Sequence, residues 1–247
     1  MTLGPATTMI SAYELEACPS SRVVGFIPTG MIDWPGKVAS TLFLAGCPMR
    51  CPYCHNPDLL DAQPVPDSWA GLLSHLSLRR GWLDGVVVTG GEPTAAPDLI
   101  DILEIFAARG IPVKLDTNGT SPQLLGHVLE AGLVEYVALD IKTLPDRYDR
   151  IGPPDADEAF LASIEIVLAS GVAHEFRTTV YPPLIATAEL PELAKLVAGG
   201  DLYVLQQFRP ERTLDPAAVS VTPASPEEIT SAAAACTSYL PTTTRGV

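Results

Sequence analysis

Residues 85–116, GVVVTGGEPTAAPDLIDILEIFAARGIPVKLD, carry the pattern that predicts the fold. Two short runs rich in Val and Ile, at residues 85–90 and 111–116, have the composition of buried strands. Between them, apolar residues recur on one face of a helix: Leu99, Ile102, Leu103 and Phe106. Gly110 follows this helix at the position where a left-handed cap residue is common. The stretch therefore predicts a strand, a helix and a second strand.

The same alternation extends along most of the chain. Six apolar runs predict strands, and they begin at Ser40, Gly85, Ile111, Val134, His174 and Asp201. Segments with helical spacing separate these runs and follow the last one, at residues 68–80, 97–109, 121–131, 157–170, 188–198 and 226–239. Because the strands are apolar throughout, we expect a parallel sheet covered on both faces. The fold class is α/β, as an open doubly wound sheet or an incomplete barrel, and both architectures bind ligands at the carboxyl ends of the strands.

Composition and charge narrow the classes of function. The length of 247 residues is enough for one large domain, and 47% hydrophobic against 18% charged residues excludes wholesale disorder. A formal net charge of −14 argues against a nucleic-acid partner and against a membrane surface. No signal-peptide pattern and no membrane-spanning apolar run is visible, so we expect a cytoplasmic protein.

We expect the folded domain to cover residues 23–240. Residues 1–22 show no sustained periodicity and are predicted to form a loose N-terminal extension. Residues 241–247, PTTTRGV, are predicted to be a frayed tail.

Three cysteines directly after the first predicted strand indicate a metal centre. Cys47, Cys51 and Cys54 have the spacing Cys-x3-Cys-x2-Cys, with no fourth cysteine nearby. Three thiolates can bind three irons of a cubane cluster and leave the fourth iron open to a substrate. The alternative is a structural zinc ion with His55 as the fourth ligand. Because His55 directly follows Cys54, the two side chains are poorly placed to share one tetrahedral ion, and the spacing favours iron and sulfur.

The second predicted strand ends in Gly90, Gly91 and Glu92. Two glycines at a strand end let a ligand approach the backbone closely, and a glutamate can receive an ammonium group. Taken alone, these residues also suit an ordinary turn from a strand to a helix.

Charged residues at the next strand ends complete a candidate site. Asp116 and Asp140 each end an apolar strand, and Lys142 and Arg177 add positive charge that can hold a carboxylate. Asp116 is equally suited to capping the following helix. Together, the groups at the strand ends describe a site for an amino acid.

These motifs resemble those of the radical S-adenosylmethionine enzymes, and within them those of the activating enzymes of glycyl-radical proteins. The resemblance covers residues 24–210 and is carried by four motifs: CPMRCPYCHN from Cys47, GGEP from Gly90, DTNG from Asp116 and DIK from Asp140. Residues 28–57 are most similar to activators of anaerobic ribonucleoside-triphosphate reductase, with activators of pyruvate formate-lyase a near second. The resemblance implies an incomplete (β/α)6 barrel, which agrees with the six strands expected from periodicity.

The resemblance also implies a role for each site residue. Cys47, Cys51 and Cys54 would bind a [4Fe-4S] cluster whose free iron is chelated by S-adenosylmethionine. Tyr53 would lie near the adenine, and the methionine ammonium would contact Gly90, Gly91 and Glu92. A monovalent cation would be surrounded by Asp116, Thr117 and Asp140, and the cofactor would contact Lys142 and Arg177. No residue is expected to act as a classical acid or base.

The implied activity is reductive cleavage of S-adenosylmethionine followed by hydrogen abstraction from a glycine of a client protein. The implied partners are this glycyl-radical client and a flavodoxin or ferredoxin that donates the electron, and the chain is expected to be a monomer. Two other functions stay open at this point. One is a ferredoxin-like carrier or zinc-binding interaction domain that uses the same cysteines, and the other is a radical enzyme that acts on a small molecule.

Overall fold

The structure, a computed structural model, describes residues 22–247, which form one eight-stranded sheet with helices packed against it. The strands are β1 (Val23–Gly30), β2 (Ala39–Leu44), β3 (Gly85–Gly90), β4 (Val113–Thr117), β5 (Tyr136–Asp140), β6 (Ala173–Val180), β7 (Tyr203–Gln207) and β8 (Thr242–Arg245). The α-helices are α2 (Ser68–Leu78), α3 (Leu99–Ala108), α4 (Pro122–Glu130), α5 (Ala156–Ser170), α6 (Leu190–Leu196) and α7 (Pro226–Cys236). Short 3-10 turns occur at Pro57–Leu59, Pro93–Ala95, Pro145–Arg150, Thr187–Glu189 and Pro216–Ser220.

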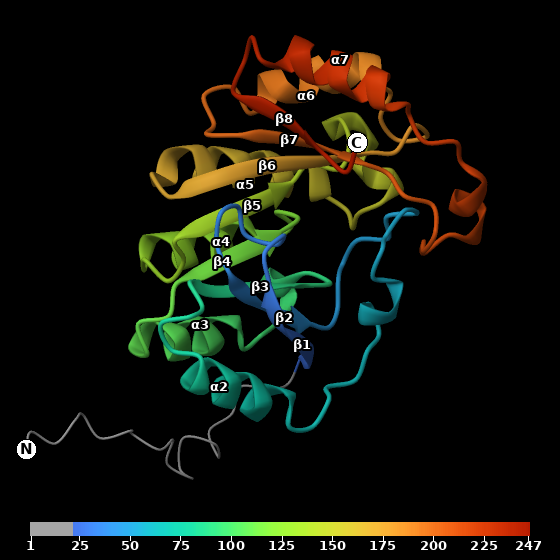
Figure 1. Cartoon of the computed structure of the whole chain (residues 1–247). Helices are drawn as coiled ribbons and strands as arrows, with labels where there is room; N and C mark the ends of the chain where they lie inside the picture. The colour runs from blue at the N-terminus through green and yellow to red at the C-terminus, as the bar shows by residue number, and fades with distance from the viewer. Residues whose placement is uncertain (1–21) are drawn as a thin grey trace, which may run out of the picture.

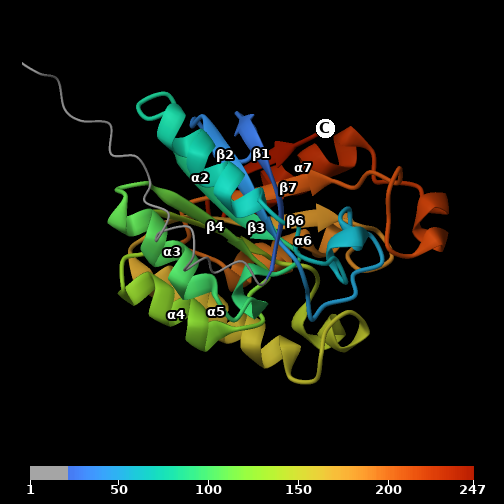
Figure 2. The same cartoon turned by 90° about the horizontal axis from the view of Figure 1, so that it is seen from below.

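The strands follow one another across the sheet in chain order from β1 to β8. All neighbours from β2 to β8 are parallel, whereas β1 is antiparallel to β2. The sheet is curved but open, with β1 and β8 as its edges in the described part of the chain, and the helices cover its outer surface (Figures 1 and 2). The strands β2 to β7, each followed by a helix, make the predicted incomplete (β/α)6 barrel, which is confirmed.

Side chains along each strand point alternately to the two faces of the sheet, which gives an apolar outer face and a polar inner face. In β4, Val113 and Leu115 belong to the main hydrophobic core, which lies between the sheet and the helices. Lys114 and Asp116 belong to the opposite face, inside the barrel, since successive side chains of a strand point to opposite faces. The inner face therefore presents charged side chains to the carboxyl ends of the strands.

The amino end of the barrel is closed by the connection between β1 and β2. Trp34, in this connection, is 4% exposed and packs in a small separate cluster with Val87 and Tyr136. A Cβ at Gly85 would lie only 2.7 Å from the Trp34 ring, so the ring covers the start of β3 directly. The barrel is consequently sealed at this end, and the polar interior is accessible from the other.

The six strands expected from the apolar runs all form, but the structure contains two more. The tail over residues 241–247, expected to be frayed, forms β8, which pairs in parallel with β7 along Tyr203–Gln206. This expectation was wrong because the tail has no apolar run of its own, and its pairing depends on the free edge of β7. β1 was missed because its side chains are mostly half-buried or exposed.

The expected loose extension lies outside the described residues except for Arg22, whose carbonyl oxygen accepts a hydrogen bond from Ala45 N at 2.7 Å. Within residues 22–247, none of the helices combines the length and the apolar character needed to cross a bilayer.

Candidate active site

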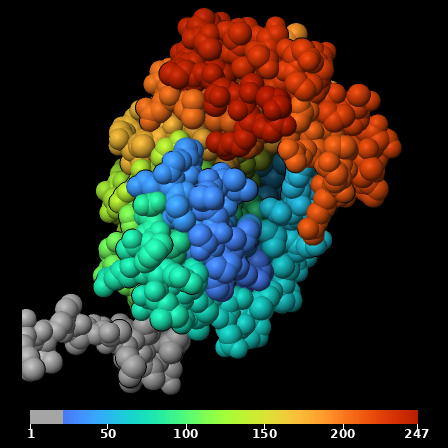
Figure 3. All heavy atoms as spheres, viewed as in Figure 1, coloured from blue at the N-terminus to red at the C-terminus, as the bar shows by residue number. Residues whose placement is uncertain are grey.

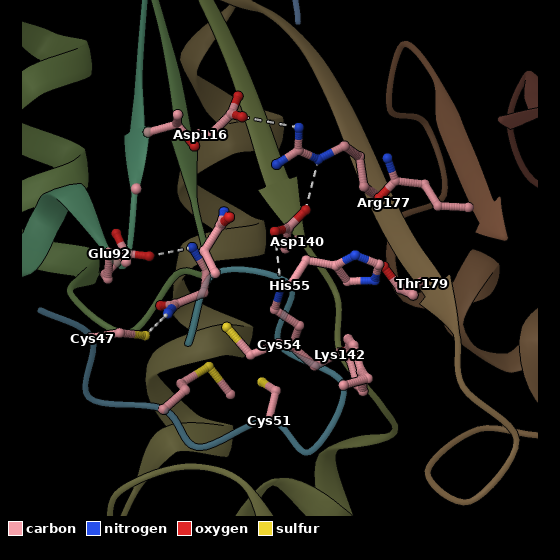
Figure 4. Close-up of a pocket in the computed structure, with 18 of the residues that line it drawn as sticks. Cys47, Cys51, Cys54, His55, Glu92, Asp116, Asp140, Lys142, Arg177 and Thr179 are labelled. Atoms are coloured by element: carbon pink, nitrogen blue, oxygen red, sulfur yellow. Dashed lines mark hydrogen bonds and ion pairs between the residues drawn. The ribbon is translucent and has the colours of Figure 1, made fainter. Parts of the chain in front are cut away.

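A pocket of about 450 Å³ opens at the carboxyl ends of the parallel strands. The pocket is lined by all twelve residues to which the family resemblance gives a role: Cys47, Cys51, Tyr53, Cys54, Gly90, Gly91, Glu92, Asp116, Thr117, Asp140, Lys142 and Arg177. They come from β3 to β6 and from the loop after β2, so the fold brings together residues that are up to 130 positions apart. Figure 3 shows a hollow between the N-terminal and C-terminal parts of the chain, and Figure 4 shows the side chains inside it.

The three cysteines lie on one loop that is tied to its surroundings by backbone hydrogen bonds. Gly46 N donates to Leu59 O at 2.8 Å, and Arg50 N donates to Ile151 O at 2.6 Å. The Arg50 guanidinium also donates to Cys47 O at 2.6 Å. The loop is therefore held on both sides although it has no regular secondary structure.

The cysteine side chains are free thiols that face the same pocket. Burial raises the pKa of Cys47 to about 12, so this thiol is protonated at neutral pH unless a metal is bound. Asn118 Nδ2 donates to Cys47 Sγ at 3.5 Å (Figure 4). Among the described residues, no three Cys, His, Asp or Glu side chains are arranged to hold a single metal ion. Three thiols are a donor set that suits a cluster in which each thiolate binds a different iron.

Gly90 and Gly91 allow the end of β3 to pass very close to the end of β2. A Cβ at Gly90 would lie 2.2 Å from Leu44 O, and one at Gly91 would lie 2.1 Å from Gly46 O. Gly90 also has a φ of +134°, which disfavours any residue with a side chain. Both glycines thus place the backbone directly beside the cysteine loop.

Glu92 is fully buried and connects the ends of β3 and β4. Its Oε1 accepts hydrogen bonds from Thr94 N at 3.0 Å, Thr94 Oγ1 at 2.7 Å and Thr117 Oγ1 at 2.7 Å. Its Oε2 accepts one, from Asn118 N at 2.6 Å. Burial raises the pKa of Glu92 although these donors oppose the shift. Oε2 keeps a lone pair that can accept one further donor.

Four charged residues at the ends of β4, β5 and β6 form a continuous chain of ion pairs (Figure 4). Arg177 donates from Nη1 to Asp116 Oδ2 at 3.1 Å and from Nε to Asp140 Oδ1 at 2.6 Å. Lys142 Nζ donates to Asp140 Oδ2 at 2.9 Å. Burial by itself would raise the pKa of Asp140, but the charges of Arg177 and Lys142 lower it below its usual range. Asp140 is therefore ionised at neutral pH.

The residues expected to surround a monovalent cation have other partners in this structure. Asp116 and Asp140 both contact Arg177, and the Thr117 hydroxyl donates to Glu92. An added cation would have to compete with the guanidinium for both carboxylates.

Tyr53 is 3% exposed and lies beside Tyr181, with 5.1 Å between the ring centroids. Its hydroxyl has no hydrogen-bond partner in the described part of the chain although it is buried. A buried, unpaired hydroxyl in a pocket is available to a bound ligand.

The sequence reasoning missed three charged residues of the barrel interior. Lys114 and Glu175 have fully buried side chains, and Arg245 Nη2 donates to Glu175 Oε2 at 3.1 Å. Lys114 and Glu175 precede Asp116 and Arg177 by two residues each, so the strand period alone places them on the same inner face. For Arg245 no such signal existed, because β8 was not expected.

Comparison with known proteins agrees with this geometry. Residues 41–197 match the model of the radical SAM superfamily, and the chain belongs to this superfamily. A putative glycyl-radical enzyme activating enzyme from Methanocaldococcus jannaschii is 33% identical over 199 residues, which cover 78% of this chain and 82% of the relative. A pyruvate formate-lyase-activating enzyme from Clostridium pasteurianum is 30% identical over 71% of this chain and 76% of its own length. Within the superfamily, the chain is a member of the glycyl-radical activating enzymes.

Solved structures support the same fold. A domain of a pyruvate-formate lyase-activating enzyme from Bacteroides vulgatus superposes with a TM-score of 0.51 at 21% identity, over 66% of this chain and 99% of that domain. Streptococcus suis SuiB bound to S-adenosylmethionine superposes with a TM-score of 0.60 at 15% identity, over 81% of this chain and 48% of SuiB.

The membership in a family of enzymes decides against an electron carrier or a zinc-binding interaction domain.

Proposed function

We propose that this chain produces a glycyl radical on a client protein, and that the client is an anaerobic ribonucleoside-triphosphate reductase. The observation that carries the proposal is the pocket at the carboxyl ends of the strands, where three free thiols lie beside a chain of partly buried ion pairs. The thiols suit an iron-sulfur cluster, and the ion pairs suit the charged end of an amino acid. The proposed reaction needs both features, because the thiols would hold the iron and the ion pairs would hold S-adenosylmethionine beside it.

The family implies a [4Fe-4S] cluster and S-adenosylmethionine, and the residues present suit both. When bound, these groups supply a 5′-deoxyadenosyl radical able to remove a hydrogen atom from a glycine Cα. Cys47, Cys51 and Cys54 would hold this cluster, and the iron left without a cysteine would be open to S-adenosylmethionine. The chain itself would bind and orient these two groups and shield them from water, since no residue of the pocket is needed as an acid or base.

The remaining pocket residues bind the cofactor in this proposal. Lys142 and Arg177 receive its carboxylate, because both cations lie at the pocket wall and are held by Asp140. Glu92 accepts from its ammonium through the free lone pair of Oε2, and the backbone of Gly90 and Gly91 lines the same part of the pocket. Tyr53 offers its unpaired hydroxyl on the adenine side.

The choice of client rests on residues 28–57, whose sequence resembles that of activators of anaerobic ribonucleoside-triphosphate reductase. The pyruvate formate-lyase-activating enzyme from C. pasteurianum, similar over 71% of this chain, makes pyruvate formate-lyase the second candidate. We further propose flavodoxin or ferredoxin as the electron donor.

The proposal is tested first without a client. Anaerobic reconstitution should yield about four irons and four sulfides per chain, as expected for one cubane cluster. Reduction with dithionite in the presence of S-adenosylmethionine should then yield 5′-deoxyadenosine and methionine. A protein that binds zinc, or that binds iron and forms no 5′-deoxyadenosine, would contradict the proposal.

The client is tested separately by electron paramagnetic resonance. The activated protein is mixed with an anaerobic ribonucleoside-triphosphate reductase or with pyruvate formate-lyase, and the doublet of a glycyl radical is recorded. A signal in the reductase alone supports the proposed client, and a signal in pyruvate formate-lyase alone replaces it. Turnover of S-adenosylmethionine with neither protein radicalised would favour a small-molecule substrate.

A further inference from the structure

Lys114 is a charged residue that the proposed reaction does not use. Its side chain is fully buried inside the barrel, below the pocket, and its ammonium group donates to the carbonyl oxygen of Asp33. The Nζ atom lies 3.4 Å from Glu175 Oε1 and 3.5 Å from Asp116 Oδ1. Removing a lysine from water is unfavourable unless carboxylates compensate its charge, and here two do so.

Lys114 belongs to a larger network that continues to the pocket wall. The ion pairs of this network join four cations, Lys114, Lys142, Arg177 and Arg245, to three carboxylates, Asp116, Asp140 and Glu175. Asp116 and Asp140 each have two cationic neighbours, and Glu175 has three, Lys114, Arg177 and Arg245. The network as a whole has one positive charge in excess. One carboxylate of a bound ligand would bring this network of charges to neutrality.

Asp116 is the point at which Lys114 acts on the site. Its Oδ2 accepts from Arg177, whereas its buried Oδ1 has no hydrogen-bond partner among the described residues. Within residues 22–247, the Lys114 ammonium group is the one cation within ion-pairing distance of Oδ1. Without this ammonium group, three oxygens, from Asp33, Asp116 and Glu175, would lose their shared partner. Glu175 would keep Arg177 and Arg245, whereas Asp116 Oδ1 would have no cation beside it in the described part of the chain.

A metal cation between Asp116 and Asp140 is disfavoured by the same pairing. Both carboxylates are already bridged by Arg177, and each has a lysine as its second neighbour. An added ion would raise the excess positive charge before any ligand binds.

We propose that Lys114 is a positioning residue that serves as a built-in cation: it balances Asp116 and Glu175, keeps Arg177 directed at the pocket, and makes binding of S-adenosylmethionine independent of sodium and potassium. This inference rests on the proposed function for the identity of the ligand. It concerns the charge balance of the chain itself, which is measurable without the ligand.

The first experiment measures stability without the cofactor. Melting temperatures of the wild-type protein and of Lys114→Ala are compared in choline, sodium and potassium chloride at equal ionic strength. The wild type should melt at the same temperature in all three salts. Lys114→Ala should melt lower in choline and recover part of the loss in sodium or potassium, because a small cation can occupy the space between the three oxygens. Lys195→Ala, at an exposed lysine of α6, is the matched control and should show no salt-specific change.

The second experiment measures binding of S-adenosylmethionine to the reconstituted protein by anaerobic calorimetry. The wild-type affinity should be the same in choline and in potassium chloride. Lys114→Ala should bind about tenfold or more weakly in choline, as expected when a buried charge loses its partner, and should recover in sodium or potassium. Its iron content should equal that of the wild type.

Three results would overturn the inference. One is a wild-type affinity that falls in choline and saturates with sodium or potassium, which would indicate a bound metal cation. Another is a Lys114→Ala variant with full affinity in choline, and the third is a variant whose defect neither cation relieves. If Lys114→Ala does not fold, the affinity of the wild-type protein in choline and in potassium chloride still tests whether binding requires a metal cation. If S-adenosylmethionine does not bind in any salt, the proposed function fails, while the melting experiment still tests Lys114.

Discussion

A single methyl group at Gly91 should disturb both the fold and the cysteine loop. In the structure, a Cβ at this position would lie 2.1 Å from Gly46 O and 2.7 Å from the Gly46 carbonyl carbon. Carbon atoms in contact prefer separations of about 3.5 Å, so Gly91→Ala requires the Gly46 peptide to move by about 1 Å or more. Cys47 directly follows this peptide, and its Cβ lies 3.3 Å from the added methyl.

The displacement also breaks a backbone hydrogen bond. Glu92 N donates to Gly46 O at 2.7 Å, and a shift of about 1 Å takes this pair beyond hydrogen-bonding distance. A buried amide left without an acceptor costs about 1–3 kcal/mol, and overpacking adds about 1–3 kcal/mol. We therefore expect Gly91→Ala to lower the free energy of unfolding by about 3 kcal/mol.

Denaturant unfolding of the protein without metal measures this loss, and iron analysis after anaerobic reconstitution measures the effect on Cys47. Gly25→Ala in β1 is the matched control, because a Cβ there has no neighbour within 4 Å. The reasoning is refuted if Gly91→Ala unfolds within about 0.5 kcal/mol of Gly25→Ala, the scatter common for surface changes, and binds iron equally well.

Three further predictions concern the cluster, the closed end of the barrel and the ion pairs. Cys51→Ala should prevent assembly of a four-iron cluster while leaving the far-ultraviolet circular dichroism unchanged, and a variant with full iron content would exclude Cys51 as a ligand. Trp34→Ala should lower the free energy of unfolding by about 3–5 kcal/mol in denaturant titrations, because it empties the small cluster that seals the barrel; a loss below about 1 kcal/mol would show that the ring is not needed there. The folded-state pKa of Asp140 lies below its unfolded value because of Arg177 and Lys142, so its contribution to stability is full above about pH 4 and is lost as the pH falls further. Unfolding titrations between pH 7 and pH 3 should show this decline in the wild type and a shallower one in Asp140→Asn, and equal slopes would contradict the assignment.

Much of the site was predictable because strand ends converge. Asp116, Asp140 and Arg177 end or follow apolar runs, and the carboxyl ends of parallel strands lie at the same edge of a sheet. The positions of these residues at the ends of the apolar runs therefore predict that their side chains share one pocket. The cysteine motif added its own local signal, since its spacing is independent of the rest of the fold.

The partners of these side chains were not predictable in the same way. Glu92 suits an ammonium group in the sequence, yet in the structure it accepts four hydrogen bonds from Thr94, Thr117 and Asn118. The family resemblance implies a monovalent cation beside Asp116 and Asp140, and in the structure both carboxylates also contact Arg177. Residue type indicates the chemistry that a side chain can perform, whereas its partner depends on which strands are neighbours and in which register.

The sequence by itself determined the α/β class, the six central strands and the cysteine motif, because each depends on residues that are close along the chain. Only the tertiary structure decided the contact of Lys114 with Asp33, 81 residues away, and the pairing of Arg245 with Glu175, 70 residues away. It also decided that the tail forms β8. These features arise from the curvature of the sheet and the free edge of β7, and local periodicity carries no information about either.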